Sequence, residues 1–195
     1  MNDQEAWQRG VRFMENIHDR LPRHARQQLG ELLDSYRRHK GEMLALTAGS
    51  SALCRDCGGQ CCLNGKYRFS GLDLLALLDQ QVPLPVPDFA QKPLCPYGDD
   101  GGCGMESAFR PLDCVLFICG AIEEITSETA ANALALLEQK LRRYVRQAET
   151  LLEQPLGRPL LLLAEHTDDT SHRTGESYRF QIKDEIKEPK TSQRR

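Results

Sequence analysis

Residues 54–62 read CRDCGGQCC, and this stretch opens the part of the chain on which the expected fold depends. All eight cysteines of the 195-residue chain lie between positions 54 and 119. They are Cys54, Cys57, Cys61, Cys62, Cys95, Cys103, Cys114 and Cys119. Thiolate sulfur is a favoured ligand of zinc and of iron–sulfur clusters. The clustering therefore predicts one or two metal–thiolate centres, with all eight cysteines as candidate ligands, carried by a helical frame.

The spacing at the start of this stretch favours metal binding over a redox disulfide. Cys54 and Cys57 are two residues apart, which places both sulfurs on one side of a tight turn, and the glycines that follow allow backbone amides to face them. Thioredoxin-like pairs share this spacing but follow a strand, and the preceding TAGSSAL is a weak strand sequence. Cys61 and Cys62 are adjacent, so their side chains point in opposite directions in an extended segment. We expect them to serve two centres, or one to ligate while the other packs or supports it.

The other four cysteines lie in a glycine-rich turn and an apolar segment. Cys95 and Cys103 bracket CPYGDDGGC, which predicts a turn that brings two thiols together and lacks the ligand positions of an EF-hand. Cys114 and Cys119 lie in RPLDCVLFIC at 110–119, which is either helical or extended. One of this pair could be an ordinary buried side chain, because free cysteine is often buried.

Arg110 is the candidate cofactor-binding cation. Four thiolates around one divalent ion leave excess negative charge, which a guanidinium or backbone amides near the sulfurs would offset. The alternative role for this arginine is a surface salt bridge. His18, His24 and His39 lie among basic residues, and we expect them to be solvated and not to bind metal.

Apolar periodicity predicts a mainly α fold, a small helical domain with an irregular, loop-rich metal site. Residues 3–21 and 25–44 each place apolar side chains at spacings of three and four, and Pro22 separates them. We expect these two helices to form an antiparallel pair. Residues 126–154 carry the longest such pattern and predict a scaffold helix of about 40 Å.

A shorter helix is predicted after residues 66–69, which could themselves form a strand. In SGLD at 70–73, the hydroxyl of Ser70 and the carboxylate of Asp73 are suited to cap a helix that continues to about Gln81. We expect Asp73 to be a capping residue and not a catalytic one.

These patterns define four regions. We expect an N-terminal helical pair at 1–46 and the cysteine-cluster metal-binding region at 47–122. Residues 123–166 hold the long helix and a short apolar segment, a helical turn or an edge strand, in the same domain. Residues 167–195 are expected to be a polar, disordered tail. The proline-rich residues 83–96 predict a stiff surface loop, with a polyproline ligand for a protein partner as the alternative.

Composition limits the partners and the compartment. The net charge of −3 gives no excess positive field, so we expect no nucleic-acid partner. The N-terminus lacks a signal-peptide pattern and no run approaches 18 apolar residues, which predicts a cytoplasmic protein without membrane contact. In a reducing compartment, eight thiols indicate metal or redox chemistry; structural disulfides would be expected if the chain were exported.

The combined cysteine spacing resembles that of the YkgJ-like cysteine-cluster family, zinc- or iron-chelating proteins often described as containing iron–sulfur clusters. The resemblance is carried by C-x2-C-x3-C-C at 54–62, CPY…GGC at 95–103 and R-P-L-D-C-x4-C at 110–119. It implies that the eight cysteines are the family's cysteines and that Arg110-Pro111 is its Arg-Pro pair. The family usually has a tyrosine between the sixth cysteine and this pair, and here GMESAF contains none.

Three functions agree with these observations. The first is a protein that holds iron, as an iron–sulfur cluster such as [4Fe-4S], for electron transfer, sensing or metal handling with a protein partner. The second is a zinc-stabilised interaction module without chemistry. The third is a cluster-dependent enzyme, either redox or methyl-transferring, since a similar cluster occurs in flagellin lysine N-methylases. The chain has no glycine-rich S-adenosylmethionine motif after a strand, which disfavours the methyl-transfer form of the third.

Overall fold

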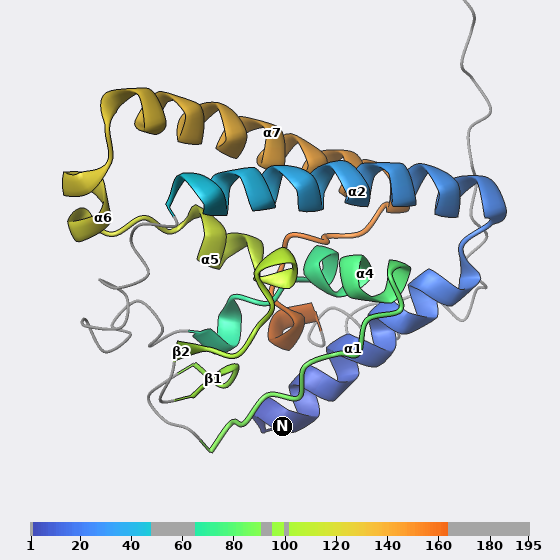
Figure 1. The fold of residues 1–195 in the computed structure, drawn as a ribbon. Helices are drawn as coiled ribbons and strands as arrows, with labels where there is room; N and C mark the ends of the chain where they lie inside the picture. Colours follow the sequence, from blue (N-terminus) through green and yellow to red (C-terminus); the bar gives the residue numbers. More distant parts are fainter. Residues whose placement is uncertain (1, 48–64, 91–94, 100–101, 164–195) are drawn as a thin grey trace, which may run out of the picture.

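The computed structural model describes residues 2–47, 65–90, 95–99 and 102–163. These residues form a mainly helical fold with a two-stranded hairpin, as the sequence predicts (Figure 1). In chain order the elements are α1 (Asp3–Arg20), α2 (Arg23–Leu46), α4 (Gly71–Asp79), β1 (Gly98–Asp99), β2 (Gly102–Cys103), the 3-10 helix η3 (Ser107–Phe109), α5 (Leu112–Leu116), α6 (Gly120–Ile125) and α7 (Glu128–Leu152). The tail expected at 167–195 lies outside the described residues.

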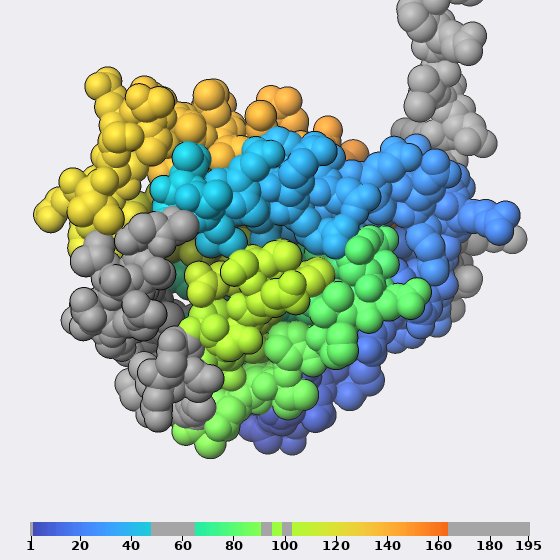
Figure 2. Space-filling model, viewed as in Figure 1, coloured from blue at the N-terminus to red at the C-terminus, as the bar shows by residue number. Residues whose placement is uncertain are grey.

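Helix α2 is the central element of the fold. It lies side by side with α7, and it also packs on α4, α5 and η3 (Figures 1 and 2). Leu29, Leu33, Tyr36 and Met43 form its buried stripe. Helix α7 is the long helix predicted at 126–154, and its N-cap is Ser127. The predicted scaffold helix is therefore confirmed, and α2 is the element that it supports.

The first two helices do not form the expected antiparallel pair. Helix α1 packs mainly on α4, whereas α2 packs on α7. Leu21 between them is extended and Pro22 is the N-cap of α2, so the chain changes direction there. The buried faces were predicted correctly and their pairing was wrong, because periodicity identifies a buried face without identifying what covers it.

The predicted cap at the start of α4 is confirmed. Ser70 Oγ accepts a hydrogen bond from the backbone N–H of Asp73 at 3.2 Å, and Asp73 Oδ2 accepts one from the N–H of Ser70 at 3.2 Å. This reciprocal arrangement is a capping box. Residues 65–67 form a short 3-10 turn, so the strand considered at 66–69 does not form.

The chain after α7 closes the fold against the start of α4. Ser70 forms an isolated antiparallel bridge with Pro159, and residues 160–163 form a helical turn. The short apolar segment, as far as residue 163, therefore contains both a single β-bridge and a helical turn. Gly10 of α1 lies against this turn, since a Cβ there would be 2.3 Å from the carbonyl oxygen of Leu160. The close approach requires glycine.

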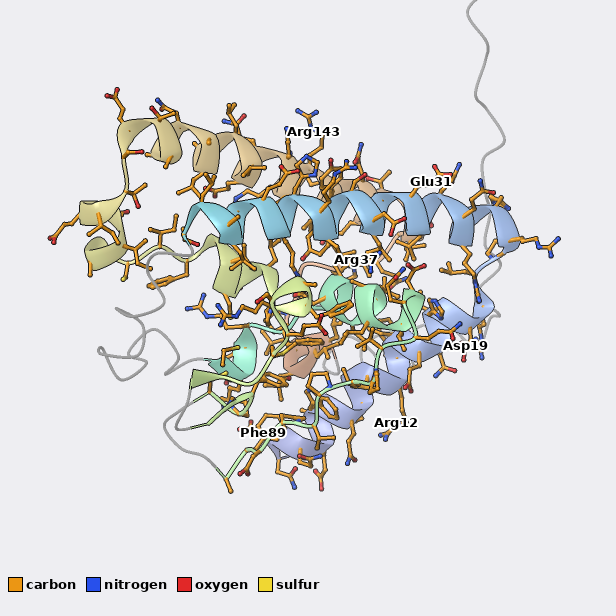
Figure 3. The ribbon with its side chains drawn as sticks, viewed as in Figure 1. Arg12, Asp19, Glu31, Arg37, Phe89 and Arg143 are labelled. Carbon is orange, nitrogen blue, oxygen red and sulfur yellow. The ribbon has the colours of Figure 1, made fainter. Side chains whose placement is uncertain are left out.

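Charged side chains cover the outer faces of the long helices. Arg12 and Asp19 on α1, Glu31 on α2 and Arg143 on α7 are exposed and extend away from the fold (Figure 3). A helix that crosses a lipid bilayer needs about 20 mostly apolar residues. None of the helices in the described part of the chain meets this requirement.

The register of α7 gives a stability prediction. Leu141 is fully buried, whereas Leu136 on the same helix is 61% exposed. We expect Leu141→Ala to lower the free energy of unfolding by about 2–5 kcal/mol, because it leaves a cavity in the core. Leu136→Ala should change it by less than about 0.5 kcal/mol. Urea denaturation followed by circular dichroism measures both, and equal effects would contradict this register.

Candidate metal centre

Four of the eight candidate ligands lie in the described residues, each on a different short segment. Cys95 precedes β1, Cys103 ends β2, Cys114 lies within α5 and Cys119 is the N-cap of α6. No disulfide joins these four to one another. The other four, Cys54, Cys57, Cys61 and Cys62, lie outside the described residues.

The segment between Cys95 and Cys103 contains two short strands on either side of residues 100–101, which lie outside the described residues. Strands β1 and β2 pair antiparallel with Gly98 opposite Cys103. The N–H of Gly98 donates to the carbonyl oxygen of Cys95 at 3.0 Å. Gly65 lies against Cys95, because a Cβ on this glycine would be 2.3 Å from Cys95 Sγ. The chain that resumes after the CRDCGGQCC segment therefore runs next to the first thiol of the turn.

Tyr97 joins this hairpin to the helical core. Trp7 Nε1 on α1 donates a hydrogen bond to the Tyr97 hydroxyl at 2.9 Å, and the Tyr97 ring lies 5.6 Å from that of Phe69 between centroids. Burial is the largest cause that raises the pKa of Tyr97, and the charges of Cys95 and Cys114 raise it further. The hydroxyl is thus a neutral group beside the thiols.

The thiols of Cys95, Cys103 and Cys114 interact electrostatically. Burial raises the pKa of Cys114, although part of its side chain is exposed, and the charges of Cys95 and Cys103 are the next largest causes. Asp73 raises the pKa of this thiol further, whereas Arg68 lowers it. Three thiols from separate segments therefore lie near one another. We call these three residues the cysteine cluster.

The cysteine cluster is not a complete metal site by itself. Within residues 2–47, 65–90, 95–99 and 102–163, no three His, Cys, Asp or Glu side chains are arranged to hold one metal ion. The ligands predicted at 54–62 lie outside those ranges.

The segment at 110–119 is neither one helix nor one extended strand. Helix α5 ends at Leu116, Phe117 is extended, and α6 begins after Cys119. Cys114 and Cys119 therefore belong to different elements. Neither alternative that the sequence left open was right, because each assumed that the segment has one conformation throughout.

The most connected polar group near the cysteine cluster is the buried carboxylate of Asp73. Its Oδ1 accepts hydrogen bonds from the Tyr36 hydroxyl at 2.9 Å, from Lys40 Nζ at 3.3 Å and from the backbone N–H of Leu112 at 3.1 Å. Its Oδ2 accepts one from Ser70 Oγ at 2.6 Å. Asp73 is thus the predicted cap, and in addition it joins α2 and α5 to α4.

Lys40 is a charged residue that the sequence analysis missed. Its side chain is 1% exposed, and its Asp73 partner is 0% exposed. Burial lowers the pKa of Lys40, while the negative charges of Asp73 and Cys114 raise it. The position of Lys40 gives a signal in the sequence, because it lies four residues after Tyr36 and three before Met43, on the buried stripe of α2.

Two arginines lie close in sequence to parts of the candidate site. Arg110 precedes Cys114 by four positions, and Arg68 follows Gly65 by three. Arg110 Nε is buried and has no hydrogen-bond partner among the described residues. Arg68 stacks over the Phe117 ring at 5.5 Å and lowers the pKa of Cys114. Arg68 therefore acts on a thiol of the cysteine cluster, and the sequence analysis had not selected it.

The histidines lie away from the candidate ligands in the sequence, and two of the three expected to be solvated differ: the His18 side chain is only 14% exposed and lies 3.7 Å from Asp19. His39 is buried, and its Nδ1 lies 2.7 Å from the carbonyl oxygen of Ser35 and 3.4 Å from the Tyr144 hydroxyl. The expectation of a solvated surface residue is wrong for His39, because it lies on the face of α2 that contacts Tyr144 of α7. His24 is exposed as expected.

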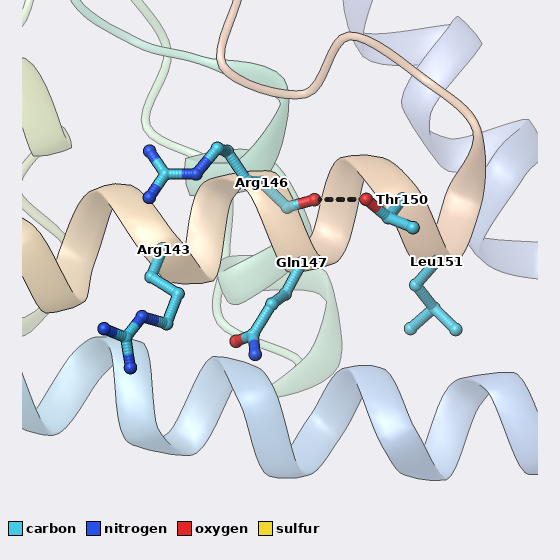
Figure 4. Close-up of a pocket in the computed structure, with 5 residues that line it drawn as sticks. All are labelled: Arg143, Arg146, Gln147, Thr150 and Leu151. Carbon is cyan, nitrogen blue, oxygen red and sulfur yellow. Dashed lines mark hydrogen bonds between the residues drawn. The ribbon is translucent and has the colours of Figure 1, made fainter.

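A shallow hollow on α7 offers no competing site. It is lined by Arg143, Arg146, Gln147, Thr150 and Leu151, all from one helix (Figure 4). Thr150 Oγ1 donates to the backbone carbonyl of Arg146 at 2.8 Å, a bond within the helix. The lining consists mostly of the apolar parts of these side chains and of exposed arginines. It contains no pair of acidic and basic side chains.

Comparison with known proteins does not extend the assignment. No protein-family model, curated protein or solved structure matches this chain. The resemblance to the YkgJ-like family therefore depends on the cysteine and Arg-Pro spacing alone.

The buried hydroxyl of Tyr97 predicts that the protein loses stability in alkali. The pKa of Tyr97 is above its ordinary value of 10.0, so the unfolded chain loses this proton first as pH rises. The stabilisation is fully present below pH 10 and falls above it, by about 1.4 kcal/mol per pH unit for each such tyrosine. We expect Tyr97→Phe to make the free energy of unfolding less dependent on pH above 10. Tyr67→Phe, at a residue that is 39% exposed, is the control and should leave that dependence unchanged in urea titrations.

Proposed function

We propose that the chain is a metal-binding protein whose cysteines hold iron, as an iron–sulfur cluster, or zinc. The observation that carries this proposal is the electrostatic interaction of Cys114 with Cys95 and Cys103, which lie up to 19 positions away in the sequence and flank the hairpin. Burial and the neighbouring Cys95 and Cys103 raise the pKa of Cys114 and so disfavour its charged form, and a bound cation would favour that form. The donor chemistry fits, because thiolates suit zinc and iron–sulfur centres.

The remaining ligands are proposed to come from the CRDCGGQCC segment. Cys61 and Cys62 precede Gly65 by four and three residues in the sequence, and Gly65 lies against Cys95. Because three or four residues of chain span only a short distance, this connection favours a centre shared with the cysteine cluster. Cys54, Cys57 and Cys119 complete the proposed set of eight, in one centre or two.

Positive groups beside the thiols support the same proposal. A centre with four thiolates and a divalent ion carries excess negative charge, and nearby cations or N–H donors offset it. Arg68 and Lys40 interact electrostatically with Cys114. Arg110, whose Nε has no partner within the described part of the chain, is proposed as a further group that faces the centre.

The proposed setting is a reducing compartment such as the cytoplasm, where thiols stay available for metal. The roles that fit an iron centre are electron transfer, sensing and metal handling with a protein partner. Zinc would instead indicate a structural interaction module, and CxxCG at 54–58 is the feature that favours it. The identity of the bound metal therefore distinguishes an iron protein from a zinc-stabilised interaction module.

The test is the metal content of the protein purified without oxygen. We expect either a brown protein with iron and acid-labile sulfide or a colourless one with zinc, measured by mass spectrometry and visible absorption. Cys95→Ser, Cys103→Ser and Cys114→Ser should each weaken metal binding by more than about tenfold, since even the loss of a group that supports a ligand costs that much.

His18→Asn on α1 is the matched control, because this side chain is proposed to take no part in binding. It should retain the metal of the parent protein. Protein that carries no iron or zinc and takes up neither under reducing conditions would contradict the proposal.

A further inference from the structure

We propose that α7 carries a self-complementary surface on which a second copy of this chain docks, with the two α7 helices antiparallel. The surface consists of exposed residues on the side of α7 opposite its buried side: Glu128, Asn132, Ala135, Leu136, Gln139 and Arg143. We call these six residues the α7 outer face. The proposal goes beyond the proposed function, because it does not depend on bound metal.

The α7 outer face is one continuous side of the helix. Its residues recur at intervals of about one turn, from Glu128 to Arg143. The buried residues Leu134, Leu137 and Leu141 lie on the opposite side, and α7 packs on α2. Helix α7 runs beside α2 at an edge of the fold, and Arg143 extends away from the fold (Figures 1 and 3). Because all six residues are exposed, a second helix can lie along this side.

The middle of the α7 outer face is uncharged. No residue from 129 to 137 is charged, over about two and a half helical turns. Leu136 is 61% exposed there, and the small side chain of Ala135 beside it allows another helix to approach closely. Helix α2 differs, because it exposes Glu31, Asp34, Arg38 and Glu42, about one charged side chain per turn. Single exposed leucines are common, so the choice of partner depends on the charges at the two ends.

The charges at the ends of the α7 outer face match a second copy in the antiparallel direction. When residue 135 of one copy faces residue 136 of the other, Glu128 of each copy lies opposite Arg143 of its partner. At 1.5 Å per residue, both side chains start about 11 Å along the helix from the two-fold axis. A two-fold interface repeats each contact, so two Glu128–Arg143 pairs form. A parallel arrangement would instead place like charges together.

Glu128 and Arg143 are available for such pairs. Among the described residues, neither side chain forms an ion pair or a hydrogen bond. The neighbouring Arg142 differs, because it pairs with Glu138 at 2.7 Å within the helix. Glu128 also suits the positive end of the α7 dipole, but Arg143 lies in the middle of the helix, where the dipole does not account for it.

The first experiment is sedimentation equilibrium of the full chain over a range of concentrations, in a reducing buffer that prevents disulfide dimers. We expect the parent to reach twice the mass of one chain as its concentration rises. Leu136→Arg places two like charges beside the two-fold axis and should leave the protein monomeric. Leu136 is not part of the core, so this substitution separates association from the folding of one chain. A parent that stays monomeric at every concentration would overturn the proposal and leave this face to a different protein.

Charge reversal tests the antiparallel pairing directly. Glu128→Arg and Arg143→Glu each replace an attraction by a repulsion at two places in the dimer, and each should weaken association by about tenfold or more. An equal mixture of the two variants restores opposite charges at both places and should form heterodimers about as tightly as the parent forms homodimers. Damage to the fold would not be repaired by mixing. A mixture that associates no better than the separate variants would overturn the arrangement.

Two variants on other helices are the matched controls. Glu31→Arg on α2 and Arg12→Glu on α1 change the net charge by the same amounts at exposed positions that extend away from the fold (Figure 3). Both should associate as the parent does, with circular dichroism showing that every variant keeps its helices. Association that falls equally in the controls and in Glu128→Arg and Arg143→Glu would show that net charge is responsible and would overturn the proposal.

Discussion

The carboxylate of Asp73 is the point at which the helical frame and the cysteine-bearing segment are joined. It accepts hydrogen bonds from two side chains of α2, from its own helix cap and from the first N–H of α5. A buried carboxylate that loses its partners costs several kcal/mol. Movement of α2, α4 or α5 relative to the others would leave part of this charge unsatisfied. The place of Cys114 is therefore determined in the core and not by the five residues of α5.

Apolar packing and hydrogen bonds contribute differently to the fold. Burial of apolar surface holds α2 against α7 and α1 against α4, but the hydrophobic effect is non-directional. Hydrogen bonds require particular distances and angles. Tyr36 and Lys40 supply two such bonds from α2, and Trp7 supplies a third from α1 to the hairpin. We infer that these polar contacts set the register between elements that apolar contacts bring together.

The sequence predicted what depends on local pattern and failed where the outcome depends on tertiary contact. The limits of the long helices, the capping box of Ser70 and Asp73 and the pairing of the strands between Cys95 and Cys103 follow from periodicity, side-chain chemistry and glycine content. The partner of α1 did not follow, because an apolar stripe is equally compatible with several neighbours. Lys40 was missed for a related reason: a lysine on a buried stripe is evident only when the missing apolar residue is treated as a signal. Its partner, Asp73, was assigned a local role that accounts for only part of its contacts.

The lengths of the elements that carry the described cysteines indicate what a bound metal would contribute. A two-stranded hairpin is marginal in water, and a five-residue helix has too few hydrogen bonds to form alone. Tyr97 and Leu112 attach these elements to the frame by hydrogen bonds, and both side chains belong to the same apolar core as the long helices. Metal ligation adds bonds between segments and thus stabilises most where other contacts are few. If the proposed metal binds, its ligation would add bonds between short elements that have few hydrogen bonds of their own.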